Sequence, residues 1–373
     1  MSKYLKNILL IFISLFISLL IAEGAARLAY DPIDFLKPVT VSDEVLRYRI
    51  EPGSGAHDGW GFRNRGVPES ADIVAIGDSH TYGISASASS SWPSQLESLS
   101  GKQVYNLGLG GYGPAEYLYL MKDKALKLNP DLIIAGFYLG NDIKDSLTAV
   151  YSVPVWEDMR DPAVASTLDD GAPEVKNGGS LSLGDWLSAN SVLYRLVSSS
   201  YIGDNLRQRR RIGKGEDIVM INDEEHGIST GFTPERRLTA LDAGNPEVRE
   251  GLRLSLELFN QMNALARENG KGFLVVIIPT KESVFADFIE GNDALGAGDK
   301  IDRLISNERK VNAIVAKYFT EHGIDYIDVL GPLQKGAYTE QIYPGNFGGH
   351  TNKNGYRIIA EAVNARLKDM PQD

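Results

Sequence analysis

The stretch "ADIVAIGDSHTYG", Ala71–Gly83, contains the clearest indication of the fold of this chain. Its first half is short, apolar and rich in β-branched residues, which is typical of a parallel strand buried on both faces. Its second half places small polar residues, with Ser79 beside His80, directly after that strand. Ligands of open α/β sheets bind beyond the carboxyl ends of the strands. The stretch therefore predicts a parallel sheet that carries Ser79 at its functional edge.

The same pattern of a short apolar run followed by a helical segment recurs along the chain. Four more runs read as strands: "QVYNLG", "DLIIAGFYLG", "GFLVVIIP" and "IDYIDV". Amphipathic segments separate them, such as 245–270, where Val248, Leu252 and Leu256 recur at helical spacing. Alternation of this kind predicts an α/β fold with a doubly wound parallel sheet of about five strands.

Composition divides the chain into five segments. We expect a signal anchor or transmembrane helix at 1–30, a lead segment at 31–70, and two core halves at 71–145 and 245–373. The alternation breaks between these halves, and long loops without structure are uncommon in compact domains, so 146–244 is predicted to be an inserted subdomain. Within the insertion, "LGDWLSANSVLYRLVSSSYI" reads as one helix.

The N-terminus carries a targeting signal. Lys3 and Lys6 precede an uncharged run, Ile8–Ala22, that is shorter than the roughly 20 residues of a comfortable membrane span. A signal-peptide core therefore competes with a membrane anchor, and "AEG" at Ala22–Gly24 offers small residues for cleavage. Glu23 and the helix-like continuation favour the uncleaved anchor. Both readings keep the N-terminus in the cytoplasm and export the body of the protein to the periplasmic or extracellular face.

Bulk composition narrows the classes of partner. The formal net charge of −11 argues against a nucleic-acid partner, because phosphate binding relies on a basic face. The absence of cysteine excludes disulfides, thiolate metal sites and cysteine nucleophiles. The five histidines are scattered without a helical His-x-x-x-His pair, so we expect no metal site.

Polar residues after three strands and before the last helix suggest acyl chemistry. A serine becomes a nucleophile when a base takes its proton and hydrogen-bond donors stabilise the resulting oxyanion. Ser79 could be that serine, the glycines of "NLGLGGYG" (Asn106–Gly113) could offer backbone N–H groups, and Asn141 could offer an amide. His350 stands just ahead of the final helix. Each feature alone is ordinary turn or cap chemistry, but all four fall at one edge of the predicted sheet.

Together, "GDSHTYG", "NLGLGGYG", "LGND" and "GGHTNKNGY" resemble the four sequence blocks of the SGNH (GDSL-type) hydrolase family. The resemblance covers 71–145 and 245–373, and implies a three-layer flavodoxin-like sheet. The resemblance implies that Ser79 is the nucleophile and His350 the base. It also implies that Ser79, Gly111 and Asn141 form the oxyanion hole, with Asp78 and Gly110 as supporting residues. The anchor, "GFRN" and "IIPTKESVF" also resemble a membrane-anchored, exported bacterial branch.

One departure from the family concerns the base. The family often has an acid three residues before the histidine, where this chain has Phe347. Three hypotheses remain: a Ser79–His350 dyad oriented by a backbone carbonyl, an acid supplied from elsewhere, or loss of activity. His80 neighbours Ser79, but adjacent side chains in a turn rarely face one another, so we expect it to have a structural or substrate-facing role.

The sequence thus predicts an exported serine esterase that needs no cofactor. It would hydrolyse ester groups, O-acetyl in particular, on an envelope or exported polysaccharide or on a small molecule, through an acyl-serine intermediate. One alternative is an O-acyltransferase that uses the same serine, because the outcome depends on whether water or an acceptor reaches the intermediate. The other is a catalytically silent carbohydrate-binding or assembly protein.

Overall fold

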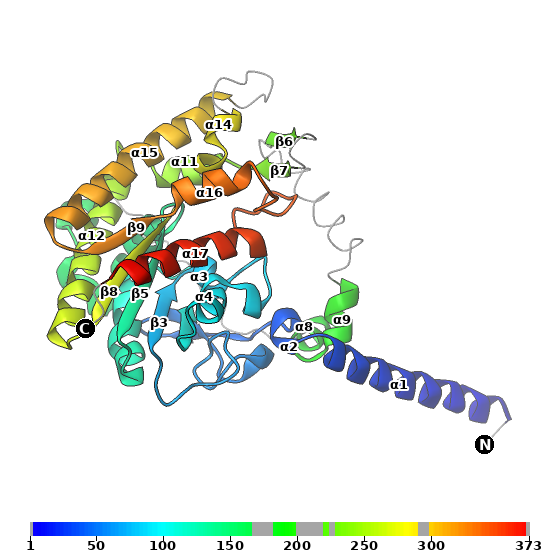
Figure 1. Ribbon diagram of the computed structural model, residues 1–373. Coiled ribbons are helices and arrows are strands. Elements are labelled where there is room, and N and C mark those ends of the chain that lie inside the picture. Colours follow the sequence, from blue (N-terminus) through cyan, green and yellow to red (C-terminus); the bar gives the residue numbers. More distant parts are fainter. Residues whose placement is uncertain (1–2, 166–181, 199–218, 224–227, 290–297, 371–373) are drawn as a thin grey trace.

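The computed structural model describes residues 3–165, 182–198, 219–223, 228–289 and 298–370. Its centre is a five-stranded parallel sheet in the order β4-β3-β5-β8-β9 (Figure 1). The chain moves from β3 to one edge and then crosses back over β3 to build the other side. This is the predicted doubly wound parallel arrangement, with its switch point beside β3.

The described elements have the following bounds. The strands are β1 Thr40–Asp43, β2 Arg47–Ile50, β3 Ile73–Gly77, β4 Val104–Gly108, β5 Leu132–Tyr138, β6 Val219–Asp223, β7 Ile228–Phe232, β8 Gly272–Ile278 and β9 Asp325–Asp328. The α-helices are α1 Lys3–Ala29, α2 Pro32–Phe35, α3 Ser79–Tyr82, α4 Trp92–Ser100, α5 Pro114–Asp123, α6 Asp142–Ser152, α7 Pro162–Ala165, α8 Leu183–Asn190, α9 Val192–Ser198, α11 Glu235–Ala240, α12 Pro246–Glu268, α13 Lys281–Val284, α14 Ala286–Ile289, α15 Gly298–Glu321, α16 Leu330–Ala337 and α17 Lys353–Asp369.

Helices cover both faces of the sheet and make three layers. Successive residues of β3 point to opposite faces, so Val74 and Ile76 pack with α5, α6 and α12, while Ile73 and Ala75 pack with α4, α16 and α17. Both faces of the sheet are therefore buried in apolar side chains. This explains why β3, β5 and β8 read as continuous apolar runs rather than as alternating ones.

The N-terminal helix α1 extends away from the body (Figure 1). It runs from Lys3 to Ala29 with a mean hydropathy of 2.5 in its most apolar window, none of which is buried. Its length and composition suit either a membrane span or a signal sequence. At its inner end Glu23 accepts hydrogen bonds from the backbone N–H groups of Val192 (3.0 Å) and Leu193 (2.9 Å), so α9 docks on α1.

One sequence expectation within the insertion is wrong. The sequence predicts one helix over 183–202, but α8 and α9 are separate and meet at Ser191, whose backbone is extended (φ −127°, ψ 114°). The Ser191 hydroxyl accepts a hydrogen bond from the N–H of Tyr194 at 3.0 Å. A serine that bonds nearby backbone competes with helix continuation, which accounts for the break. Residues beyond Ser198 in that stretch lie outside the described residues.

Candidate active site

The turn after β3 fixes the backbone of Ser79. Asp78 occupies the N-cap of α3, and its Oδ1 accepts a hydrogen bond from the N–H of His80 at 2.8 Å. Asp is a favoured N-cap residue because its carboxylate satisfies an N–H group that has no partner within the helix. Ser79 is thereby the first residue of a one-turn helix at the carboxyl end of a buried strand.

A glycine socket holds this turn against the sheet. Gly77, Gly108 and Gly136, which lie on β3, β4 and β5, surround the side chain of Thr81. A Cβ atom added at these positions would lie 2.0, 2.9 and 2.6 Å, respectively, from atoms of that side chain. Those distances are too short for any real side chain, so all three glycines are required where the helix meets the sheet.

Ser79 and His350 come together from opposite ends of the chain. Ser79 Oγ lies 2.8 Å from His350 Nε2. Ser79 retains 9% exposure, so its hydroxyl is nearly enclosed. A nucleophile and a base within hydrogen-bond reach are the geometric signature of an activated serine.

His350 lies beside a cation instead of a carboxylate. Within the described part of the chain, no carboxylate forms a hydrogen bond or ion pair with His350. The guanidinium of Arg237, from α11, packs so closely on Gly349 that a Cβ atom there would meet it at 1.8 Å. Burial, together with the charge of Arg237, lowers the pKa of His350 to about 4. The imidazole is therefore neutral, and able to accept a proton, at any pH well above 4.

Lysine 281 holds the loop that carries this histidine. Its buried side-chain nitrogen, whose pKa burial lowers to about 7, donates hydrogen bonds to the carbonyls of Gly231 (2.8 Å), Asn346 (3.0 Å) and Gly348 (3.2 Å). The next residue, Glu282, forms an ion pair with Arg237 at 2.8 Å. Neighbouring residues at the start of α13 thus tie both the loop before His350 and the arginine beside it.

His80 supports the base by packing. Its ring is fully buried, lies 4.8 Å from the His350 ring and 4.1 Å from the Tyr138 ring, and forms no hydrogen bond within the described residues. Burial lowers the pKa of His80 well below its usual value, so the ring is neutral. These contacts agree with the structural role expected for it.

Asp78 also reaches the nucleophile. The second carboxyl oxygen of Asp78, Oδ2, lies 3.0 Å from Ser79 Oγ. Burial raises the pKa of Asp78 to about 7. The serine hydroxyl has one hydrogen, so an ionised Asp78 competes with His350 for it, whereas a protonated Asp78 can donate its own hydrogen to the serine.

The candidate oxyanion donors lie beside Ser79. Gly111 has a positive φ of 81°, which a glycine adopts without strain, and a Cβ atom added to Gly110 would lie 3.4 Å from Ser79 Cβ. One hydrogen of the Asn141 amide bonds the carboxylate of Asp145, which leaves the second for a ligand. The structure therefore brings Ser79, Gly110, Gly111, Asp78 and His350 into one cluster and places Asn141 at the end of the neighbouring strand β5.

Sequence reasoning missed the residues that surround this cluster. Arg237 belongs to the insertion, where no motif marked it, while Lys281 lies in the "IIPTKESVF" segment that carried only a family resemblance. The sequence signal for Lys281 is a charged pair that begins three residues after the end of a fully apolar strand. In the described part of the chain, no group of three His, Asp or Glu side chains is arranged to hold a metal ion.

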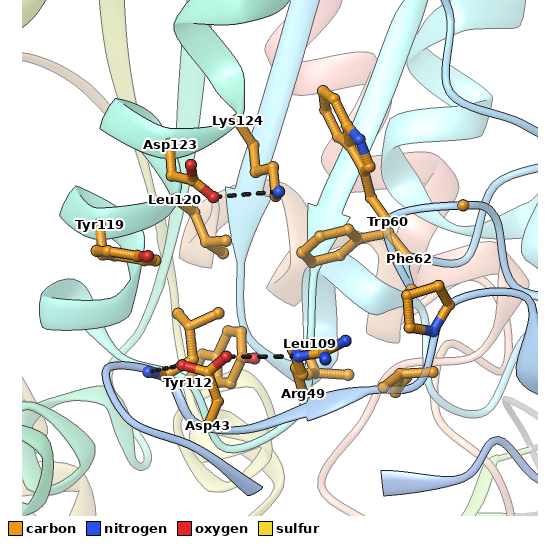
Figure 2. Close-up of a pocket in the computed structure, with 15 residues that line it drawn as sticks. Asp43, Arg49, Trp60, Phe62, Leu109, Tyr112, Tyr119, Leu120, Asp123 and Lys124 are labelled. Carbon is orange, nitrogen blue, oxygen red and sulfur yellow. Dashed lines mark hydrogen bonds and ion pairs between the residues drawn. The ribbon is translucent and has the colours of Figure 1, made fainter. Parts of the chain in front are cut away.

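A separate cavity lies under the hairpin formed by β1 and β2. Its volume is about 200 Å³, and neither Ser79 nor His350 is among its lining residues. Figure 2 shows Trp60 and Phe62 of the lead segment facing Leu120 and Tyr119 of α5 across it. Two ion pairs flank the space: Asp43–Arg49 (3.5 Å) and Asp123–Lys124 (3.1 Å). The cavity is thus distinct from the serine–histidine cluster.

Comparison with known proteins gives matches among solved structures alone. No family model matches the chain, and no curated protein matches it. It is similar to a proposed lipolytic protein of the G-D-S-L family from Desulfitobacterium hafniense (14% identity, 79% of this chain and 97% of that one, TM-score 0.39). It is also similar to a GDSL-like lipase from Bacteroides thetaiotaomicron (10% identity, 80% of this chain and 87% of that one, TM-score 0.34). A third similar structure is a catalytic mutant of an acetylxylan esterase from Geobacillus stearothermophilus (10% identity, 81% of this chain and 95% of that one, TM-score 0.39).

Proposed function

We propose that this chain is a serine esterase of the SGNH type, exported and held at a membrane by α1. The observation that carries the proposal is the 2.8 Å separation between Ser79 Oγ and His350 Nε2 at the carboxyl edge of a doubly wound sheet. The four sequence blocks that resemble the SGNH family supply the residues of this cluster. The preference for O-acetyl esters of a polysaccharide rests on that resemblance and on the apolar N-terminal helix.

The reaction would follow from the positions of these groups. Ser79 Oγ attacks the ester carbonyl carbon, and His350 Nε2 takes the serine proton. The carbonyl oxygen becomes an oxyanion that the N–H groups of Ser79 and Gly111 and the Asn141 amide stabilise. His350 then gives its proton to the departing alcohol, which leaves an acyl-serine. Water activated by His350 hydrolyses that intermediate.

We favour a Ser79–His350 dyad among the three hypotheses for His350, but without the expected backbone carbonyl, since none of the described carbonyls bonds its ring. No described carboxylate bonds the ring either, and the charged group that lowers its pKa is the Arg237 cation. Packing supports the orientation instead: His80 lies against the ring, while Lys281 and Arg237 hold the preceding loop. Removing the acid of a triad leaves a serine and a histidine that can still transfer the proton, at reduced rate.

A serine-directed phosphonate tests the proposal. The full-length protein in detergent should be labelled by the probe and should hydrolyse a small acetyl ester, and Ser79→Ala should lose both. Ser85→Ala serves as the matched control, because this serine lies on the same connection after α3 and should leave both readouts unchanged. Labelling with little hydrolysis until an acceptor sugar is added would assign an O-acyltransferase instead. A wild-type protein that neither labels nor hydrolyses would overturn both enzyme functions.

A further inference from the structure

The glycine loop beside Ser79 is held from outside the sheet by the lead segment. The Tyr48 hydroxyl donates a hydrogen bond to the carbonyl of Gly110 at 2.6 Å, and the Arg47 guanidinium donates one to the carbonyl of Gly111 at 2.6 Å. Arg47 and Tyr48 are the first two residues of β2. Two consecutive side chains of one hairpin therefore fix two consecutive carbonyls of the loop.

Arg47 adopts a backbone conformation that disfavours a side chain. Its φ is +64°, where the turn between β1 and β2 returns to the second strand. A residue other than glycine is strained in this left-handed region. Its guanidinium forms an ion pair with the fully buried Glu116 at 2.6 Å, and the other Glu116 oxygen accepts the N–H of Gly113 at 3.0 Å. These contacts with the loop offset the strain and depend on an arginine at this turn.

The direction of the Gly110 carbonyl sets the direction of the next N–H group. Across a trans peptide the C=O of one residue and the N–H of the next point in opposite directions, and the described chain has no cis peptide bond. With the Gly110 carbonyl bonded to Tyr48, the N–H of Gly111 points away from Tyr48. Gly110 itself packs against Ser79, while a Cβ atom at Gly111 would meet the Tyr48 hydroxyl oxygen at 2.2 Å.

We propose that Tyr48 and Arg47 are positioning residues of the oxyanion hole, because their hydrogen bonds hold the Gly110–Gly111 peptide with its N–H group aimed at the reacting carbonyl oxygen. The inference rests on the proposed esterase function. Preorganised donors stabilise a transition state because they need no rearrangement when the charge develops. Burial raises the pKa of Tyr48 to about 12, so the phenol remains a donor throughout the pH range in which His350 is a neutral base.

The test compares two Tyr→Phe variants in the full-length protein. Tyr48→Phe removes the hydroxyl and keeps the ring that packs on Tyr112. Its kcat for an acetyl ester should fall by about 10- to 100-fold, somewhat less than the loss from deleting an oxyanion donor outright, with KM nearly unchanged. Tyr119→Phe, on α5, should keep the wild-type kcat and KM. Both variants should share the wild-type unfolding midpoint within a few degrees.

A boronic acid reads the oxyanion hole without turnover. Ser79 Oγ adds to boron, its proton passes to His350, and the tetrahedral boronate anion occupies the place of the transition state. Tyr48→Phe should weaken the inhibition constant by about the same factor as kcat, while Tyr119→Phe leaves it unchanged. Arg47→Lys keeps a positive charge beside Glu116 but has one nitrogen, where arginine uses Nε for Glu116 and Nη2 for the Gly111 carbonyl. This variant should therefore also show a lower kcat and a weaker boronate inhibition.

The outcomes separate this inference from the proposed function. An active wild type whose Tyr48→Phe variant matches it in kcat and boronate affinity would overturn the positioning role and leave the esterase standing. A rise in KM with an unchanged kcat would also overturn the role. So would a fall in kcat that a lower unfolding midpoint explains. A wild type that neither hydrolyses esters nor binds phosphonate or boronate would overturn both.

Discussion

His350 lies beside the Arg237 cation, at the place where a hydrolase triad would have a carboxylate. Burial and Arg237 hold its pKa at about 4, and a base must be unprotonated to take the serine proton. The acid limb of kcat/KM should therefore have its midpoint near pH 4, below the usual histidine value of about 6.5. Arg237→Gln removes the cation and leaves Glu282 uncompensated, and both changes favour the imidazolium. The limb should then move to higher pH.

The matched control for that variant is Arg253→Gln. Arg253 lies on α12, with its side chain half exposed and paired with Glu250, and it makes no contact with His350. Its pH–rate profile should coincide with that of the wild type. An acid limb that stays in place in Arg237→Gln would contradict the electrostatic role of Arg237.

We expect Asp78 to set the alkaline side of the same profile. Its pKa is raised by burial to about 7, so the carboxyl is protonated below that pH and ionised above it. The ionised form accepts the Ser79 hydrogen and places a negative charge near the oxyanion, so kcat/KM should fall as the pH rises through about 7. Asp78→Asn keeps the acceptor for the His80 N–H and supplies an amide donor at every pH. Steady-state kinetics from pH 5 to about pH 9 should show no alkaline limb in this variant; a limb that persists would assign it to another group.

Among the helices and strands, the four-residue helix α13 supports the surroundings of His350. Its first two side chains, Lys281 and Glu282, hold the loop before His350 and the arginine beside it. Lys281→Met removes the buried ammonium and leaves acceptors without donors, so the free energy of unfolding should fall by about 1–3 kcal/mol. The rate of phosphonate labelling at Ser79 should fall as well, because His350 loses its support.

Chemical denaturation and labelling kinetics measure the two effects separately. Lys271→Met is the matched control, because Lys271 lies at the opposite end of the strand that leads to α13 and bonds the exposed side chain of Asn129. It should leave the labelling rate unchanged. A Lys281→Met protein that labels at the wild-type rate would show that the loop before His350 keeps its conformation without the ammonium.

The elements also show which inferences are available from sequence. The meeting of Ser79 with His350 follows from strand order, because carboxyl ends of parallel strands share an edge. The approach of Arg237 does not, since it depends on how the insertion docks against the core. The break at Ser191 has a local cause, but a serine inside an amphipathic pattern is compatible with a continuous helix. The hairpin contacts of Arg47 and Tyr48 join segments about sixty residues apart that carry no shared motif.

In the whole molecule, Glu23 joins α1 to the body of the protein. Its carboxylate accepts hydrogen bonds from two backbone N–H groups at the start of α9 and from the Ser191 hydroxyl, whose Oγ lies 2.8 Å from Glu23 Oε2. A cut at Ala22–Gly24 would detach the apolar helix at this junction, whereas the proposed anchor stays joined to α9. The full-length chain should stay in the membrane fraction at high salt, with an N-terminus that still includes residues 3–22.

The junction itself is tested by Glu23→Gln. An amide has a single acceptor oxygen, so at least one of the bonded groups on α9 loses its partner. Limited proteolysis should then cut faster within 182–198 than in the wild type. Glu44→Gln, at the exposed turn of the hairpin, should give the wild-type pattern. Equal cutting in all three proteins would show that α9 docks without Glu23.

The glycine socket has a consequence for how such a protein can change over time. Thr81 occupies a space bounded by glycines from three strands, so a substitution at any one of them expels the turn that carries the nucleophile. At Gly108 the nearest atoms belong to the backbone of Thr81 and Tyr82, so a smaller residue at position 81 would not relieve the clash there. We therefore expect Gly77, Gly108 and Gly136 to tolerate substitution less than other positions on the same three strands.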